Sequence, residues 1–163
     1  MRIAAPKLFY RMCGLAALVM LLDQASKFLV FRVLLKDQPE MVILPVFSLV
    51  TRYNTGISFS ILATDHASGP WLFALLATLI ALGLLIWLSQ TADRVPAVGL
   101  AFVIGGAIGN VIDRVREGAV LDFLLFHWNE LAWPAFNLAD SAIFVGVALL
   151  IYDGVFGART RTA

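Results

Sequence analysis

The sequence predicts an all-α membrane protein, a bundle of four transmembrane helices, with a small β layer at the membrane surface. Hydrophobic residues make up 61% of the 163 residues, and the mean hydropathy is +0.89, whereas about half of a soluble domain is apolar. The apolar residues gather into four stretches, each long enough to cross a hydrocarbon layer of about 30 Å. Because lipid offers the backbone no hydrogen-bond partners, all four stretches should be helices.

The expected spans cover about residues 10–35, 71–90, 95–112 and 136–156 of one integral membrane domain, residues 1–163. The first span is similar to a secretory signal, but the segment from Asp23 to Lys27 that interrupts its apolar run contains no small-residue cleavage site. We therefore expect it to stay in the protein as a span. The second span carries no formal charge, and polar residues gather instead at the end of the third span and the start of the fourth.

The distribution of lysine and arginine predicts the orientation, because cytoplasmic loops carry an excess of both residues. One side of the membrane would hold Arg2, Lys7, Arg11, Arg94, Arg159 and Arg161. The opposite loops would hold Lys36, Arg52 and Arg116, with Arg114 at their boundary. Both termini should therefore be cytoplasmic, and the loops 36–69 and 115–135 should lie outside, in the periplasm of a Gram-negative cell.

The first outer loop has the pattern of a small β layer. Residues 47–49 and 57–61 alternate between apolar and polar side chains, as half-buried strands do. Asn54, Thr55 and Gly56 lie between them and indicate a turn. In the second outer loop, the aromatic residues of segment 123–133 suit the membrane interface, where tryptophan is enriched.

The end of the third span carries polar residues on one helix face. Asn110, Asp113 and Arg114 have i, i+3, i+4 spacing, which places them side by side. We interpret Asp113 as an interfacial charge at the helix end, and we expect Asn110 and Arg114 to hold a carboxylate in place. Gly105 and Gly109 form a small-xxx-small pair that lets another helix approach closely.

Two further aspartates, one at each end of the second outer loop, have both a structural and a functional interpretation. Asp122 stands alone among apolar residues, as a solvated loop residue or a catalytic group would. Asp140 follows Asn137 at the spacing of a helix N-cap and its acidic partner, so it could simply cap the fourth span. Carboxylates in such different settings are suited to shared acid–base work. We therefore hypothesise a two-carboxylate peptidase site at the outer edge of the membrane.

Polar residues elsewhere could brace this site. Asp23 and Lys27 have i, i+4 spacing in the first span and form either a self-compensating pair or a support for the site. Asn54 and Gly56 belong either to a plain turn or to the same support.

Composition argues against several other classes of function. The net charge of +1 gives no basic field for nucleic acid. The single cysteine, Cys13, and the absence of HExxH spacing argue against a metal site, so we expect no metal and no cofactor. Ser141 and His127 suggest a serine protease, but no strained nucleophile turn surrounds Ser141. A proton-coupled transporter that uses Asp23, Asp113 and Asp140 as a relay would be expected to show an inverted repeat, and none is visible in the sequence. A non-enzymatic assembly factor would instead bind its partner through the face of Gly105 and Gly109.

Five blocks of the chain resemble, in order, the motif set of the lipoprotein signal peptidase (signal peptidase II) family. They are DQASK at 23–27, NTGISFS at 54–60, GNVIDR at 109–114, VLDF at 120–123 and FNLADSAI at 136–143. The resemblance extends from the first span to the fourth. It implies a periplasmic β cradle, an interfacial helix over the site, and a location in the bacterial inner membrane, with the site near the periplasmic face.

The resemblance also implies an activity and its residues. Members of this family are aspartic endopeptidases that remove the signal peptide of prolipoproteins just before a diacylglyceryl-modified cysteine. Asp122 and Asp140 match the catalytic pair. The supporting positions match Asp23, Asn54, Gly56, Asn110, Arg114 and Asn137. We expect Lys27, the partner of Asp23, to support the site with them. The expected partners are lipid-modified prolipoproteins and membrane lipid, with no nucleic acid, and the protein is expected to act as a monomer.

Overall fold

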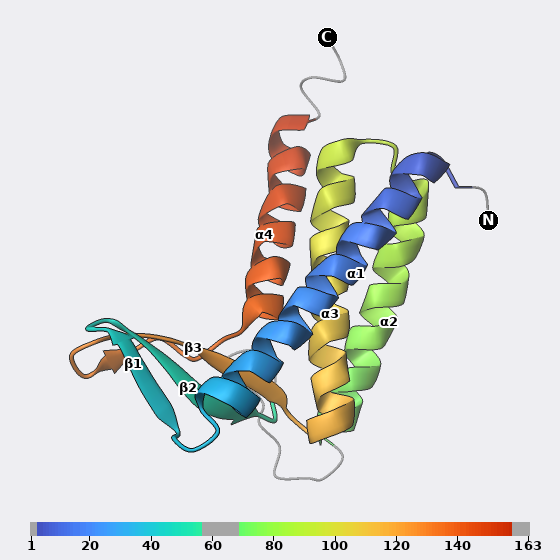
Figure 1. Ribbon diagram of the computed structural model, residues 1–163. Coiled ribbons are helices and arrows are strands. Elements are labelled where there is room, and N and C mark those ends of the chain that lie inside the picture. The colour runs from blue at the N-terminus through green and yellow to red at the C-terminus, as the bar shows by residue number, and fades with distance from the viewer. Residues whose placement is uncertain (1–2, 57–68, 158–163) are drawn as a thin grey trace.

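Four long helices form the body of the protein in the computed structural model, which describes residues 3–56 and 69–157 (Figure 1). They are α1 (Pro6–Leu29), α2 (Gly69–Gln90), α3 (Arg94–Glu117) and α4 (Leu138–Tyr152). Short π-helical segments, Val30–Leu34 and Asp153–Gly157, extend α1 and α4. All four helices are long and apolar enough to cross a membrane, which confirms the predicted bundle.

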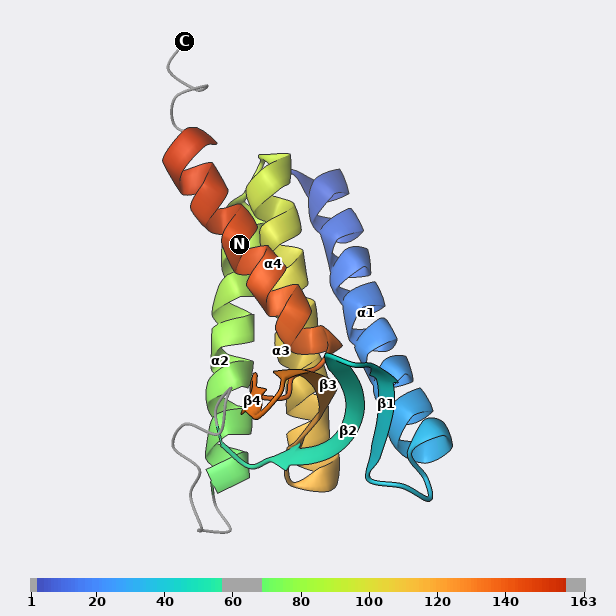
Figure 2. The same ribbon diagram turned by 90° about the vertical axis from the view of Figure 1, so that its left-hand side faces the viewer.

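Helix α3 lies in the middle of the bundle and packs against the other three (Figure 2). Its glycines allow this packing. A Cβ atom on Gly105 would lie 2.5 Å from the carbonyl oxygen of Ala16 in α1, and one on Gly106 would lie 2.5 Å from the carbonyl oxygen of Ala139 in α4. A Cβ atom on Gly109 would lie 2.5 Å from Oδ2 of Asp23. The predicted close approach of a helix to Gly105 and Gly109 is therefore confirmed.

A four-stranded antiparallel sheet lies at one end of the bundle, and the start of α1 and the end of α4 lie at the other (Figure 1). In spatial order the strands are β1 (Glu40–Leu44), β2 (Phe47–Asn54), β3 (Val120–Trp128) and β4 (Leu131–Ala132). Strand β2 confirms the prediction for residues 47–49, whereas the predicted strand 57–61 lies outside the described residues. The register pairs Asn54 with Val120 and Arg52 with Asp122. The last residues of β2 therefore lie beside the first residues of β3.

The structure corrects one helix boundary and gives the secondary structure of the second outer loop. The third helix continues past residue 112 to Glu117 and ends at Gly118, whose φ of 70° suits a helix C-terminus. Segment 123–133, which the sequence places at the interface because of its aromatic residues, belongs mainly to strands β3 and β4. Residues 35–56 and 118–137 contain no helix. The expected interfacial helix is therefore not in them, and residues 57–68 lie outside the described part.

Candidate active site

Strand β3 carries Asp122 into the space between the sheet and the helices. The side chain is only 3% exposed, because β2 pairs with β3 on one side and the segment before α4 runs along the other. The backbone N–H groups of Phe123 and Leu124 both donate to the carbonyl oxygen of Phe136. This pairing brings the start of α4 beside Asp122, although a turn and strand β4 lie between β3 and α4 in the sequence.

Asp140 lies in the first turn of α4, where it forms the predicted capping box. The side chain of Asn137 accepts a hydrogen bond from the backbone N–H of Asp140 (2.9 Å), and Oδ2 of Asp140 accepts one from the backbone N–H of Asn137 (3.2 Å). The other carboxylate oxygen, Oδ1, accepts a hydrogen bond from Nδ2 of Asn110 at 2.9 Å. Both oxygens of Asp140 are thus held by donors, and the carboxylate has a fixed orientation.

Asn137 connects the two carboxylates. Its Nδ2 donates to Oδ1 of Asp122 at 2.8 Å, while its backbone N–H donates to Asp140. Asn54 holds the other oxygen of Asp122, donating from Nδ2 to Oδ2 at 3.1 Å. Asp122 and Asp140 both line one cavity of about 290 Å³, whose remaining wall is apolar and includes Phe144 of α4. The structure therefore brings the predicted pair to one place.

The surroundings of Asp122 favour its protonated form. Burial, and secondly the nearby carboxylate of Asp140, raise the pKa of Asp122 to about 7, although the amides of Asn54 and Asn137 act in the opposite direction. A carboxyl group with this pKa can hold or release a proton near neutral pH. Two carboxylates in one cavity with such a proton are equipped for general acid–base chemistry.

The predicted supporting residues from β2 and α3 converge on the pair. Nδ2 of Asn137 also donates to Oδ1 of Asn110 at 3.2 Å. Arg114 donates from Nη2 to the carbonyl oxygen of Gly56 at 2.9 Å and from Nη1 to the carbonyl oxygen of Asn110 at 3.3 Å. The backbone N–H of Gly56 donates to Oδ1 of Asn54, which closes the predicted turn.

The predicted pair in the first span is part of the same network. Lys27 donates from Nζ to Oδ2 of Asp23 at 2.7 Å and to Oδ1 of Asn110 at 3.2 Å. Oδ1 of Asp23 accepts a hydrogen bond from the backbone N–H of Ala139, at the start of α4. Asp23 and Lys27 are therefore both a buried ion pair and a support for the site.

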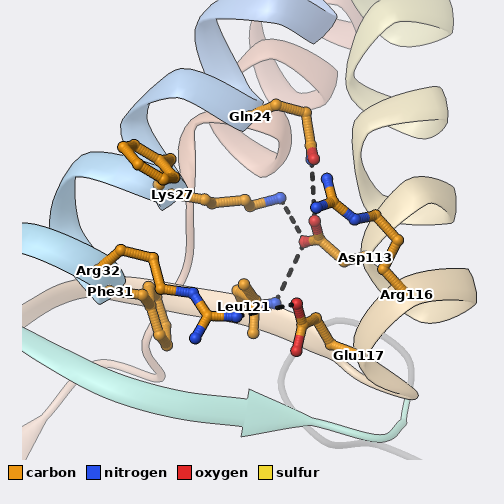
Figure 3. Close-up of a pocket in the computed structure, with 9 residues that line it drawn as sticks. Gln24, Lys27, Phe31, Arg32, Asp113, Arg116, Glu117 and Leu121 are labelled. Atoms are coloured by element: carbon orange, nitrogen blue, oxygen red, sulfur yellow. Dashed lines mark hydrogen bonds and ion pairs between the residues drawn. The ribbon is translucent and has the colours of Figure 1, made fainter. Parts of the chain in front are cut away.

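Asp113 is not the interfacial helix-end charge that the sequence predicts. It is buried, and it forms an ion pair with Lys27 across the interface between α1 and α3, at 2.6 Å (Figure 3). Gln24, which is not among the predicted site residues, donates from Nε2 to Oδ1 of Asp113 at 2.9 Å. The signal for both residues is their spacing, because Gln24 precedes Lys27 by almost one helical turn and Asp113 follows Asn110 by the same interval.

The residues of the serine-protease alternative are not brought together. His127 contacts the buried hydroxyl of Ser48 at 3.1 Å, whereas Ser141 donates to the carbonyl oxygen of Asn137. Within residues 3–56 and 69–157, no cluster of at least three His, Cys, Asp or Glu side chains is placed to bind a metal ion.

Comparisons with known proteins agree with the geometry. Residues 15–156 match the family model described as signal peptidase (SPase) II. A protein from Aeromonas hydrophila named lipoprotein signal peptidase is 48% identical over 147 residues, covering 88% of this chain and 87% of its own length. One of the same name from Pseudomonas aeruginosa is 44% identical, covering 85% and 84%. A solved bacterial membrane enzyme superposes with a TM-score of 0.77 at 26% identity, covering 89% of this chain and 87% of its own.

Proposed function

Because the chain belongs to the signal peptidase II family, it is a peptidase that removes signal peptides from lipoproteins, and we propose that Asp122 and Asp140 are its catalytic pair. The observation that carries the proposal is the placement of both carboxylates on one cavity, with Asn137 bonded to each. The family consists of peptidases, which favours this function over a proton-coupled transporter.

The reaction needs one proton shared by the pair. Two carboxylates close together do not both ionise easily, so near neutral pH they hold a single proton. The ionised member takes a proton from a water molecule while the water oxygen attacks the scissile carbonyl carbon. The protonated member donates to the carbonyl oxygen, which gives a tetrahedral diol. When the C–N bond breaks, a proton passes to the leaving amine and the carboxyl product forms.

Asn110, Asn137 and Arg114 would orient the pair and stabilise the developing negative charge. Fixed donors in a site that excludes water are effective in this role, because they need no reorganisation during the reaction. Arg114 is almost fully buried, and its Nε has no hydrogen-bond partner among the described residues. The role that we assign to Arg114 is therefore electrostatic, because its positive charge interacts with both Asp140 and Asp122.

The cavity fits an apolar peptide that arrives from the membrane. Beside the two carboxylates it is lined by Ile143, Phe144 and Val147 of α4, and Phe144 is 76% exposed on a helix surface that would face lipid. We propose that the apolar end of the signal peptide enters sideways from the bilayer and unwinds at the carboxylates. A backbone without regular structure is tolerated at this depth only where protein shields it. The lipid chains of a diacylglyceryl-modified cysteine stay in the bilayer, and the cut falls just before that cysteine.

We further propose how this multi-pass protein is placed. The chain forms one membrane domain in the bacterial inner membrane and acts as a monomer. The sheet and the active site lie at the periplasmic face, and both termini lie in the cytoplasm. The distribution of lysine and arginine supports this orientation, and so does the position of the start of α1 and the end of α4 at the end of the bundle opposite the sheet (Figure 1).

The direct test is cleavage of a diacylglyceryl-modified prolipoprotein by purified protein in lipid nanodiscs, with products identified by mass spectrometry. Asp122→Asn and Asp140→Asn should each reduce turnover by at least about a thousandfold. Asp37→Asn is the matched control, because Asp37 is exposed in the outer loop beside β1 and should keep full activity. Full turnover by either dyad variant would refute the assignment.

A further inference from the structure

Asp113 makes polar contacts with two other segments of the protein, α1 and the start of β3. It is 2% exposed, in the last turns of α3. Its Oδ2 accepts hydrogen bonds from Nζ of Lys27 at 2.6 Å and from the backbone N–H of Leu121 at 3.2 Å, and its Oδ1 accepts one from Gln24 at 2.9 Å (Figure 3). The carboxylate therefore joins α1, α3 and the start of β3.

Two of these contacts lead to the two proposed catalytic carboxylates by separate routes. Leu121 is the residue before Asp122, so its N–H bond to Asp113 fixes the backbone of β3 next to the first carboxylate. Lys27 also donates to Oδ1 of Asn110, whose Nδ2 donates to Asp140. The second route therefore ends on the other carboxylate.

We propose that Asp113 is a positioning residue, which sets the placement of Asp122 relative to Asp140 by holding the Leu121 backbone and Lys27 with one carboxylate. The inference rests on the proposed function, since it takes these two aspartates as the catalytic pair. Asp113 does not touch the substrate in this proposal.

The contacts require a carboxylate rather than another polar group. All three partners of Asp113 are donors, and an ionised carboxylate can accept from all of them because it carries no hydrogen of its own. An asparagine at this position would keep one acceptor oxygen and turn its NH₂ group toward at least one of these donors. A single buried partner lost in this way disturbs the whole network.

The cavity that Asp113 lines is distinct from the one that holds the catalytic pair. It has a volume of about 70 Å³ and lies between α1, the end of α3 and Leu121, with Phe31, Arg32 and Glu117 around it (Figure 3). None of its lining residues lines the cavity of Asp122 and Asp140. Loss of the Asp113 carboxylate should therefore alter the geometry of the pair and leave the substrate-binding surface in place.

The test compares Asp113→Asn with Glu117→Gln in the prolipoprotein cleavage assay. Glu117 lines the same small cavity, but it pairs with Arg32, at 3.7 Å, rather than with Lys27 or Leu121. For Asp113→Asn, kcat per folded molecule should fall by about a hundredfold, as expected for misplaced catalytic groups, with KM within about twofold of the parent. The affinity for a peptide analogue carrying a tetrahedral hydroxyl group should fall by the same factor as kcat/KM. Glu117→Gln should leave all three quantities within about twofold.

A kcat per folded molecule within twofold of the parent would overturn the inference, because it would reduce Asp113 to a residue that only holds the helices together. A rise in KM without a fall in kcat would also overturn it. If Asp113→Asn does not accumulate, Asp113→Glu is measured in the same way; it keeps the charge facing Lys27 but moves the carboxylate by one methylene, and the same outcomes decide. Loss of activity in Asp122→Asn and Asp140→Asn, measured alongside, keeps a failure of this inference distinct from a failure of the proposed catalytic pair.

Discussion

Replacing Asp122 with asparagine should stabilise the folded protein at pH 8 while it abolishes cleavage. The folded state holds the pKa of Asp122 at about 7, whereas an aspartate in an unfolded chain has a pKa of about 3.9. The folded protein therefore binds this proton more tightly than the unfolded chain does. Stability is lost as pH rises from about 4 to about 7. Above that range, the ionised side chain lowers the free energy of unfolding by the full penalty that corresponds to the pKa rise.

The magnitude follows from the size of the pKa rise. One pKa unit corresponds to 1.36 kcal/mol, so a rise of about three corresponds to about 4 kcal/mol at pH 8. Asparagine removes this penalty but disturbs one of the hydrogen bonds that Asp122 accepts from Asn54 and Asn137, at a cost of about 2 kcal/mol. The net gain of about 2 kcal/mol corresponds to a rise in Tm of about 6 °C for a chain of this length.

The assay is thermal unfolding in detergent, followed by tryptophan fluorescence, for the parent and for Asp122→Asn at pH 8 and pH 5. At pH 5, about one unit above the pKa of the unfolded aspartate, only about 1.5 kcal/mol of this penalty has developed. The gain then falls short of the cost of the disturbed hydrogen bond, so the variant should melt slightly below the parent. Asp37→Asn is the control, since this exposed residue should give no difference between the two pH values. If the Tm of Asp122→Asn falls below that of the parent as much at pH 8 as at pH 5, the reasoning is refuted. Ionised Asp122 would then not destabilise the folded protein.

Other consequences of the structure can be measured independently. The kcat/KM for cleavage should decline as pH rises above about 7, since the pair then loses the proton that Asp122 holds; a rate that keeps rising to pH 9 would contradict a protonated acid. Cleavage should survive exhaustive chelation unchanged, as expected of an aspartic mechanism, and activity restored only by added metal would count against it. Gly109→Ala places a Cβ atom 2.5 Å from the fixed carboxylate of Asp23 and should lower Tm by about 5 °C. Gly83→Ala is the control, because the space around its Cβ position is open, and it should leave Tm unchanged. Equal melting of both variants would argue against the close helix approach. In a cysteine-free background, an impermeant maleimide applied to intact spheroplasts should label a cysteine at position 37 and not one at position 92, and the reverse pattern would invert the proposed topology.

The spans could be predicted from the sequence because hydrophobic length is a local property of the chain. The end of α3 could not, because the burial of Asp113 depends on Lys27, which lies 86 positions earlier (113 − 27) and on another helix. Taken alone, an aspartate beside an arginine at the end of an apolar run has the pattern of an interfacial charge. Only the packing of α1 against α3 shows that the arginine and the aspartate point to different partners.

The same distinction holds for the site and the sheet. The capping box of Asn137 and Asp140 is encoded within four consecutive residues, so it was accessible to sequence reasoning. The family resemblance gives Asn137 a supporting role, but its bond to Asp122 is not visible in the sequence, because β3 and the start of α4 meet only through backbone pairing at Phe136. The aromatic residues of segment 123–133 indicate the membrane interface, but its continuous apolar run has no alternation that would predict strand β3.

The position of Asp140 in the last helix has a consequence for how the protein is made. The groups around the site are spread along the chain, beginning with Asp23 in α1 and ending with Asp140 in α4. A chain that has inserted only its first three spans during synthesis holds Asp122 without its partner. If Asp122 and Asp140 are the catalytic pair, as we propose, the proteolytic activity is withheld until the final span enters the membrane, and a partly made or truncated chain cannot cut its neighbours.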